Sequence, residues 1–282
     1  MNAVATIAQT LANAARALSA YSDSPRLDAE LLLGKVLGLS RSSLIAHDAR
    51  LLDADDENAY VNLIQQRTRG VPIAYLTGCR EFWSLPLIVT PDVLVPRPET
   101  ESLVQHALQV MPSETAVSVL DLGTGCGAIA LSLAHERPGW DITAVDLSPQ
   151  ALEVAARNSA LLGLARIKWR LGNWFEAVPG ESFRLIVANP PYIAEGDPAL
   201  ASLTAEPSLA LTAGPTGLNA LEAIIAHAPL HLHARGWLVL EHGATQAPAV
   251  TALLAQRGFT SVATFPDFSG KPRITLGTHT HH

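Results

Sequence analysis

The fold is decided by the stretch Asp121-Leu122-Gly123-Thr124-Gly125-Cys126-Gly127, which joins two apolar segments. Residues 117–122 are typical of a short buried strand, and residues 128–136 of a helix. Glycines at a strand-to-helix turn let the backbone approach a ligand closely, and the start of the helix offers free N–H groups. The stretch therefore predicts a ligand-binding loop, with a simple tight turn as the alternative.

The glycine spacing narrows the choice of ligand. A dinucleotide fingerprint has the spacing G-x-G-x-x-G, whereas this loop has G-x-G-x-G with Asp121 before it. An acid at that point would repel a pyrophosphate, and no Gly-Lys-Ser or Gly-Lys-Thr follows to form a phosphate loop. A ligand with an ammonium group, such as S-adenosylmethionine, fits better. Asp146 ends the next expected strand, where a carboxylate can accept hydrogen bonds from both hydroxyls of a ribose.

Strands and helices alternate along the chain from residue 116 onward. We expect strands at 117–122, 142–146, 166–171, 185–188, 237–241, 260–265 and 273–276, and helices at 128–136, 148–162, 217–233 and 245–257. Strict alternation predicts an α/β fold with a mostly parallel sheet, helices on both faces and ligands at the carboxyl ends of the strands. The short connection 266–272 allows the last two strands to form an antiparallel hairpin.

The front of the chain has a different pattern. Helices are expected at 3–18, from Pro25 after the N-cap Ser24, and at 53–69 before Gly70. A strand pair, 81–83 and 85–89, then leads into the proline-rich loop 94–99. We expect a helical domain over 1–72, a β-hairpin linker over 73–98 and an α/β domain over 99–282.

A second motif, Asn189-Pro190-Pro191-Tyr192, directly follows the strand expected at 185–188. A planar NH₂ group is a weak nucleophile because its lone pair is delocalised. Asn189 Oδ1 and the Pro190 carbonyl could accept both of its hydrogens, since proline has no N–H to compete. Tyr192 would cover the flat face of the amide, and transfer of a methyl group from a sulfonium would then depend mainly on position. The alternative is a rigid proline turn with a buried tyrosine.

Composition and charge exclude several classes of protein. The 282 residues are 48% hydrophobic and carry a formal net charge of −7, with no basic footprint for long nucleic acid. No apolar run approaches the ~20 residues of a membrane span, and Met1 to Ala20 does not have the pattern of a signal peptide. Cys79 and Cys126 have neither disulfide nor zinc spacing. We expect a cytoplasmic protein with no bound metal.

With these residues assembled, the chain resembles the HemK/PrmC family of protein-glutamine methyltransferases, which modify peptide release factors. The likeness extends over nearly the full length and includes both motifs above. The linker segments are more specific than Asn-Pro-Pro-Tyr, which amino-methylating enzymes of DNA, RNA and protein share. The other matching segments are 70–78, Glu81-Phe82, 95–101, 206–211 and 240–243.

The resemblance implies a Rossmann-like class I methyltransferase fold with a seven-stranded sheet. It implies S-adenosylmethionine as cofactor, with S-adenosylhomocysteine as product, and the glutamine of a Gly-Gly-Gln motif in class 1 release factors as substrate. It assigns recognition of the release factor to the helical front domain, and we expect a monomer. The implied cofactor site is Gly123, Thr124, Gly125, Cys126, Gly127, Asp146, Trp174 and Asn189. The implied substrate site is Asn189, Pro190, Pro191 and Tyr192, of which Asn189, Pro190 and Tyr192 are the expected catalytic residues.

Some assignments stay open at this stage. Asn173 stands where many relatives have an acid, although its amide oxygen could still accept a hydrogen bond from the adenine. Glu99 and Glu101 could face the cofactor or could only begin a helix. Three other functions remain as alternatives: methylation of an exocyclic amine on a nucleic-acid base, binding without catalysis, and hydride transfer. The net charge disfavours the first, the intact motifs the second, and the glycine spacing the third.

Overall fold

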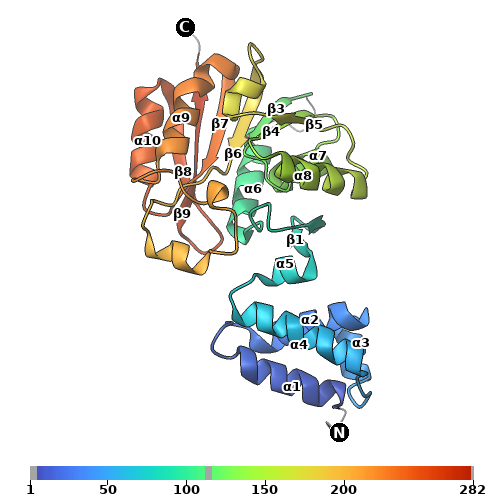
Figure 1. The fold of residues 1–282 in the computed structure, drawn as a ribbon. Helices are drawn as coiled ribbons and strands as arrows, with labels where there is room; N and C mark the ends of the chain where they lie inside the picture. The colour runs from blue at the N-terminus through green and yellow to red at the C-terminus, as the bar shows by residue number, and fades with distance from the viewer. Residues whose placement is uncertain (1–4, 112–115, 281–282) are drawn as a thin grey trace. The chain divides into compact units, whose positions relative to one another are not determined.

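The computed structural model describes residues 5–111 and 116–280, so residues 3 and 4 of the first expected helix lie outside it. The chain divides into two compact units (Figure 1). The first comprises residues 1–79 with the short segment 202–205, and the second comprises 80–201 and 206–282. The division between 79 and 80 falls inside the linker expected at 73–98, and the three-part division itself stays a prediction.

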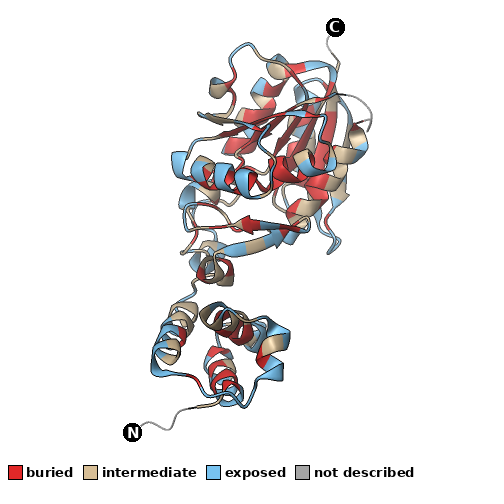
Figure 2. Ribbon diagram, turned by 90° about the vertical axis from the view of Figure 1, so that its right-hand side faces the viewer, coloured by how far each residue is buried: buried red, intermediate tan, exposed pale blue. Residues whose placement is uncertain are grey.

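The first unit is helical, with a hydrophobic core of its own that includes Ile7, Leu32 and Tyr60. Buried residues lie on the inward faces of its helices (Figure 2). The Asp53 side chain accepts a hydrogen bond from the Asp56 N–H and begins α4, as a helix N-cap should. Two of the helices, α3 and α5, are not predicted by the sequence pattern because they are only one or two turns long. The helices are α1 (Ile7–Leu18), α2 (Pro25–Leu37), α3 (Arg41–Ala46), α4 (Ala54–Thr68) and α5 (Ile73–Thr77).

A hairpin of β1 (Cys79–Phe82) and β2 (Leu85–Ile88) confirms the strand pair predicted from the sequence. Its two loop residues, Trp83 and Ser84, have φ values of 52° and 60°. A two-residue loop with positive φ at both positions suits the right-handed twist of the strands. The Trp83 N–H donates to Glu101 Oε1 at 2.9 Å, which ties the hairpin to the start of the next helix.

The second unit is built on a seven-stranded sheet with the order β5-β4-β3-β6-β7-β9-β8. β9 alone among these strands runs antiparallel to its neighbours, which confirms the mostly parallel sheet and the terminal hairpin. The strand order reverses between β3 and β6, which is where open α/β sheets bind their ligands. The strands are β3 (Ser118–Leu122), β4 (Asp141–Asp146), β5 (Lys168–Leu171), β6 (Phe183–Ala188), β7 (Leu232–Glu241), β8 (Phe259–Pro266) and β9 (Pro272–His279).

Helices cover both faces of this sheet (Figure 1). α9 (Asn219–His227) and α10 (Ala247–Gln256) share a core with Leu120, Ile186 and Leu238 on one face. α6 (Glu101–Val110) contacts β6 and β7 on the other face, where α7 (Ala128–Glu136) and α8 (Pro149–Leu161) contact β4. α6 is not among the helices expected from the alternation, but it agrees with the alternative in which Glu99 and Glu101 begin a helix. The α-helix expected at 217–233 spans only 219–227 and continues as a 3-10 helix over Ala228–His231, because Pro229 has no N–H for the α-helical hydrogen bond.

Candidate active site

The register of the sheet brings the two sequence motifs together. Leu122 of β3 pairs with Val145 of β4 on one side and with Ala188 of β6 on the other. The next residues along these parallel strands are Gly123, Asp146 and Asn189. The glycine loop therefore lies between the acid of β4 and the Asn-Pro-Pro-Tyr motif, at the carboxyl edge of the sheet.

A cavity of about 390 Å³ opens at this edge. Its walls include residues from the linker, from both motifs and from the segment after the second motif. Six of the residues implied as site residues line it, namely Gly123, Gly125, Asp146, Trp174, Asn189 and Pro191. The residues that the sequence predicts as a site are therefore largely collected around one hollow.

Backbone geometry explains the glycines that face the cavity. Gly123 and Gly125 have φ values of 73° and 57°, a region that L side chains rarely adopt. A Cβ on Gly123 would lie 3.2 Å from the Trp174 ring, whereas a Cβ on Gly125 would meet nothing within 4 Å. Trp174 thus packs on the loop, and the backbone of Gly125 stands open to a ligand.

Asp146 lines the cavity directly beside the loop. Its Oδ2 accepts from the Gly125 N–H at 2.8 Å, and its Oδ1 accepts from the Ser148 N–H at 2.9 Å. Each carboxylate oxygen has a second lone pair for a ligand hydroxyl. Burial raises the pKa of Asp146, while these N–H groups lower it. Asn173 also lines the cavity, and its Nδ2 donates to Glu176, which leaves its carbonyl oxygen available. This donor and acceptor set suits a nucleoside.

Three of the implied cofactor residues, Thr124, Cys126 and Gly127, do not line the cavity. Their contacts lie within the fold and support the loop. The Thr124 hydroxyl donates to Asp121 Oδ2 at 2.7 Å. Cys126 is buried, which raises the pKa of its thiol to about 12 and leaves no thiolate nucleophile. A Cβ on Gly127 would lie 3.1 Å from the Trp169 ring, so this glycine is needed for close packing.

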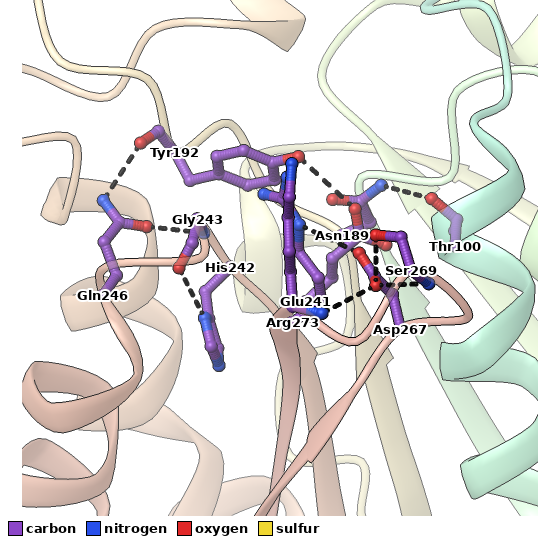
Figure 3. A network of polar contacts seen from close by, with 11 residues as sticks. Thr100, Asn189, Tyr192, Glu241, His242, Gly243, Gln246, Asp267, Ser269 and Arg273 are labelled. Carbon is purple, nitrogen blue, oxygen red and sulfur yellow. Dashed lines mark hydrogen bonds and ion pairs between the residues drawn. The ribbon is translucent and has the colours of Figure 1, made fainter.

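The Asn-Pro-Pro-Tyr motif is held by groups from three other segments (Figure 3). Asn189 Nδ2 donates to Thr100 Oγ1 at 3.1 Å, which leaves Oδ1 as a free acceptor. The Tyr192 hydroxyl donates to Glu241 Oε1 at 3.4 Å, and its carbonyl accepts from Gln246 Nε2 at 3.0 Å. Pro190, the second residue of the motif, is buried. Burial raises the pKa of Tyr192 well above its usual value, so this side chain is a neutral phenol.

Glu241 ends β7 and is 1% exposed. Burial raises its pKa to about 7, while the Thr100 hydroxyl and the Arg273 charge lower it. The charge of Glu99 raises the pKa further, so Glu99 lies near the site, whereas Glu101 begins α6 and binds the hairpin. The sequence did not single out Thr100 or Glu241. An acid at the end of an apolar strand, as with Asp146, was the available signal for Glu241.

A buried ion pair joins two walls of the cavity. Glu206 accepts from the Arg97 guanidinium and, at 3.1 Å, from the Val95 N–H. It thereby fixes the proline-rich loop against the segment 206–213, several residues of which line the cavity. Within the described residues, no cluster of three His, Cys, Asp or Glu side chains could hold a metal ion. No helix between residues 5 and 280, leaving out 112–115, is long and apolar enough to cross a membrane.

The sheet order and the glycine-loop cavity define the class of this protein, a Rossmann-like class I methyltransferase. A methyltransferase of Pyrococcus furiosus has the same fold, with a TM-score of 0.54 and 18% identity over 70% of this chain and 90% of its own. Residues 9–78 match the family model of the PrmC N-terminal domain, and residues 100–214 match that of the methyltransferase small domain.

Relatives from bacteria then narrow the class to a family. A release factor glutamine methyltransferase of Xylella fastidiosa is 48% identical over 254 residues, covering 89% of this chain and 92% of the relative. An Escherichia coli K12 protein of the same name is 44% identical over 260 residues, covering 92% and 94%. The chain belongs to the release factor glutamine methyltransferase family, as the resemblance of its motifs predicted.

Proposed function

We propose that this protein methylates the side-chain amide nitrogen of the glutamine in the Gly-Gly-Gln motif of class 1 peptide chain release factors, using S-adenosylmethionine. The observation that carries the proposal is the state of Asn189. Its NH₂ group is bound by Thr100, so its carbonyl oxygen remains an acceptor at the cavity beside the glycine loop. Such an acceptor suits a substrate with an NH₂ group. Family membership supports glutamine as that substrate.

The acceptors of the motif activate the amide. A glutamine NH₂ group has two hydrogens, and Asn189 Oδ1 and the Pro190 carbonyl would accept one each. Electron density on the nitrogen then rises, and its lone pair is held in one direction. Pro190 and Pro191 contribute no N–H, which would otherwise bind the glutamine carbonyl in the wrong orientation.

The cofactor would be held by the residues around the glycine loop. Asp146 would accept from the ribose hydroxyls, Gly125 would give the backbone room to approach, and Trp174 with Asn173 would border the adenine. When bound, S-adenosylmethionine supplies an electrophilic methyl group on a sulfonium. Placing the glutamine nitrogen in line with that methyl group is the main task of the protein.

Proton transfer requires no dedicated carboxylate. After methylation the amide nitrogen carries a positive charge and is strongly acidic, so it releases its proton to water. Tyr192, a neutral phenol with its ring on the core of the second unit, covers the substrate amide and does not act as a base. The helical front domain recognises the release factor, and the enzyme acts as a monomer in the cytoplasm.

The test is methyl transfer from labelled S-adenosylmethionine to purified release factor. The wild-type release factor is compared with a variant in which alanine replaces the glutamine of Gly-Gly-Gln, and duplex DNA is assayed in parallel. We expect label on the wild-type release factor alone. The Asn189→Ala enzyme should lose transfer, because Asn189 contacts the reacting amide.

Two outcomes would overturn the proposal. Label on the duplex DNA would assign the site to an exocyclic amine of a base. Label on the release factor that survives loss of the glutamine would mean that another side chain is the acceptor.

A further inference from the structure

The proposed reaction requires one particular orientation of the Asn189 side-chain amide. The oxygen and NH₂ ends of an asparagine side chain have nearly the same size, so hydrogen bonds alone decide which end points where. Only the oxygen can accept from a substrate NH₂ group. If the amide turned over, two NH₂ groups would face each other and the substrate would not bind in a reactive position.

Thr100 touches the end of the amide that faces away from the substrate. Its hydroxyl oxygen lies 3.1 Å from Asn189 Nδ2, and the residue is only 4% exposed. A hydroxyl can donate or accept, so Thr100 by itself would tolerate either orientation of Asn189. If its hydrogen pointed at Asn189, it would bind the amide oxygen and hold the amide in the wrong orientation. A second group must therefore take the Thr100 hydrogen.

The fold places Glu241 where it can take that hydrogen. Ala188 pairs with Leu240 in the parallel ladder of β6 and β7, so Asn189 and Glu241 follow on the same face of the sheet. This is the face that α6 covers, and Thr100 directly precedes α6. Figure 3 shows the three side chains together at the ends of these elements.

The Glu241 carboxyl has an acceptor for each of two hydroxyls. Its Oε1 accepts from Tyr192 at 3.4 Å. Its Oε2 is buried and has no hydrogen-bond partner within the described residues. The Thr100 hydroxyl is close enough to lower the pKa of this carboxyl, so it is a donor that can serve Oε2. When Glu241 is ionised it cannot donate, so in that state the hydrogen runs from Thr100 to Glu241.

We propose that Thr100 and Glu241 are positioning residues that hold the Asn189 amide with its oxygen toward the substrate. Glu241 accepts the Thr100 hydrogen, and the Thr100 oxygen then accepts from Asn189 Nδ2. The same carboxylate steadies Tyr192, so one buried acid orients both polar residues of the motif. This inference rests on the proposed function, because only a substrate with an NH₂ group needs an acceptor at this position.

The test compares Thr100→Val with Thr100→Ser and with a matched control, Thr251→Val. The Thr251 hydroxyl forms a hydrogen bond with the Thr264 hydroxyl at 3.3 Å, between α10 and β8. For Thr100→Val we expect kcat for release-factor methylation to fall by about tenfold to a hundredfold, because a misplaced catalytic group costs up to that much. The KM for release factor and the Kd for cofactor should stay unchanged. Thr100→Ser, which keeps the hydroxyl, should restore kcat, and Thr251→Val should have no effect.

A second experiment separates orientation from folding. Glu241→Gln keeps the shape of the side chain but offers only one acceptor oxygen to the two hydroxyls, and Glu222→Gln on α9 is its exposed control. We expect Glu241→Gln to lower kcat, and the double variant with Thr100→Val to lose less than the sum of the two single losses, since both changes act on Asn189. If Thr100→Val does not fold, the positioning role is tested by Glu241→Gln alone. Its kcat should be lower than that of Glu222→Gln, and an equal kcat would overturn the role.

The outcomes distinguish this inference from the proposed function. Wild-type enzyme that methylates no release factor would overturn the proposed function and, with it, this inference. Active wild-type enzyme with an unchanged kcat in Thr100→Val would overturn only the positioning role. Strictly additive losses in the double variant, or losses confined to KM or to cofactor Kd, would also overturn it.

Discussion

Asp121 has no exposed surface, although the sequence suggested an acid that faces a ligand. It lies on β3 directly before the glycine loop and accepts the Thr124 hydroxyl, so it supports the loop from within the fold. Burial raises its pKa from 3.8 to about 7, although the Thr124 hydrogen bond lowers it. The carboxyl therefore titrates in a range where the unfolded chain is already ionised.

This shift predicts a pH dependence of stability. The native state holds the Asp121 proton up to about pH 7, whereas the unfolded chain releases it near 3.8. The stabilising contribution is thus fully present below 3.8 and is lost as the pH rises through about 7. Glu241, whose pKa is raised to about 7, contributes with the same sign. We expect Asp121→Asn to make the free energy of unfolding fall less steeply across this range.

Tryptophan fluorescence during urea unfolding measures this effect in the second unit alone. All 5 tryptophans of the chain lie after residue 80. Asp141→Asn is the control, because Asp141 is an exposed acid at the start of β4, the strand next to β3. If the free energy of unfolding depends on pH equally steeply in Asp121→Asn and in the wild type, the raised pKa assigned to Asp121 is wrong.

At the scale of elements, α8 joins the hairpin to the glycine loop through one side chain. Asn158 is fully buried, and its Oδ1 accepts from the Ile88 N–H at 2.6 Å. Its Nδ2 donates to the Ile88 carbonyl at 3.0 Å and to the Cys126 carbonyl at 2.9 Å. A helix, an edge of the hairpin and the ligand loop thus share one amide.

We expect Asn158→Ala to destabilise the second unit by about 2 to 5 kcal/mol, because it leaves three backbone groups without a partner. Cofactor affinity should fall as well, since the loop loses the support at Cys126. Urea unfolding and calorimetric titration with S-adenosylmethionine measure the two effects. Gln150→Ala is the control on the same helix, where the amide is exposed. If Asn158→Ala is as stable as Gln150→Ala, water must replace the hydrogen bonds of the Asn158 amide.

At the scale of the whole molecule, the two units have separate cores, and the cavity belongs to the second. Its lining residues lie between Asp92 and Ala220 and include none from the first unit. We expect a chain that begins at residue 80 to bind S-adenosylmethionine with the Kd of the full chain. Its kcat/KM for release factor should be far lower, because recognition is assigned to the helical front domain.

Calorimetric titration and the labelled-methyl assay, run on both chains, measure these two quantities. Equal kcat/KM values would remove the recognition role from the front domain. Loss of cofactor binding in a folded truncated chain would mean that the cavity depends on the first unit.

Local patterns were sufficient for the elements and the motifs. The glycine loop, the acid at the end of β4 and Asn189 through Tyr192 are each contiguous with a strand, so the sequence places them at the carboxyl edge of a parallel sheet. The hairpin is equally local. α3 and α5 are too short for a periodic signal, and Pro229 shortens the helix predicted at 217–233 because it lacks an N–H, an effect that the apolar pattern does not contain.

The sequence by itself determined the class of fold, the two motifs and the family, because each depends on residues that are neighbours along the chain. Only the tertiary structure decided which residues line the cavity and what holds the catalytic amide. Thr100 and Glu241 meet Asn189 through the register of β6 with β7 and the packing of α6. Contacts of that kind depend on burial and strand pairing between segments 89 and 52 residues apart in the sequence, and no local pattern encodes them.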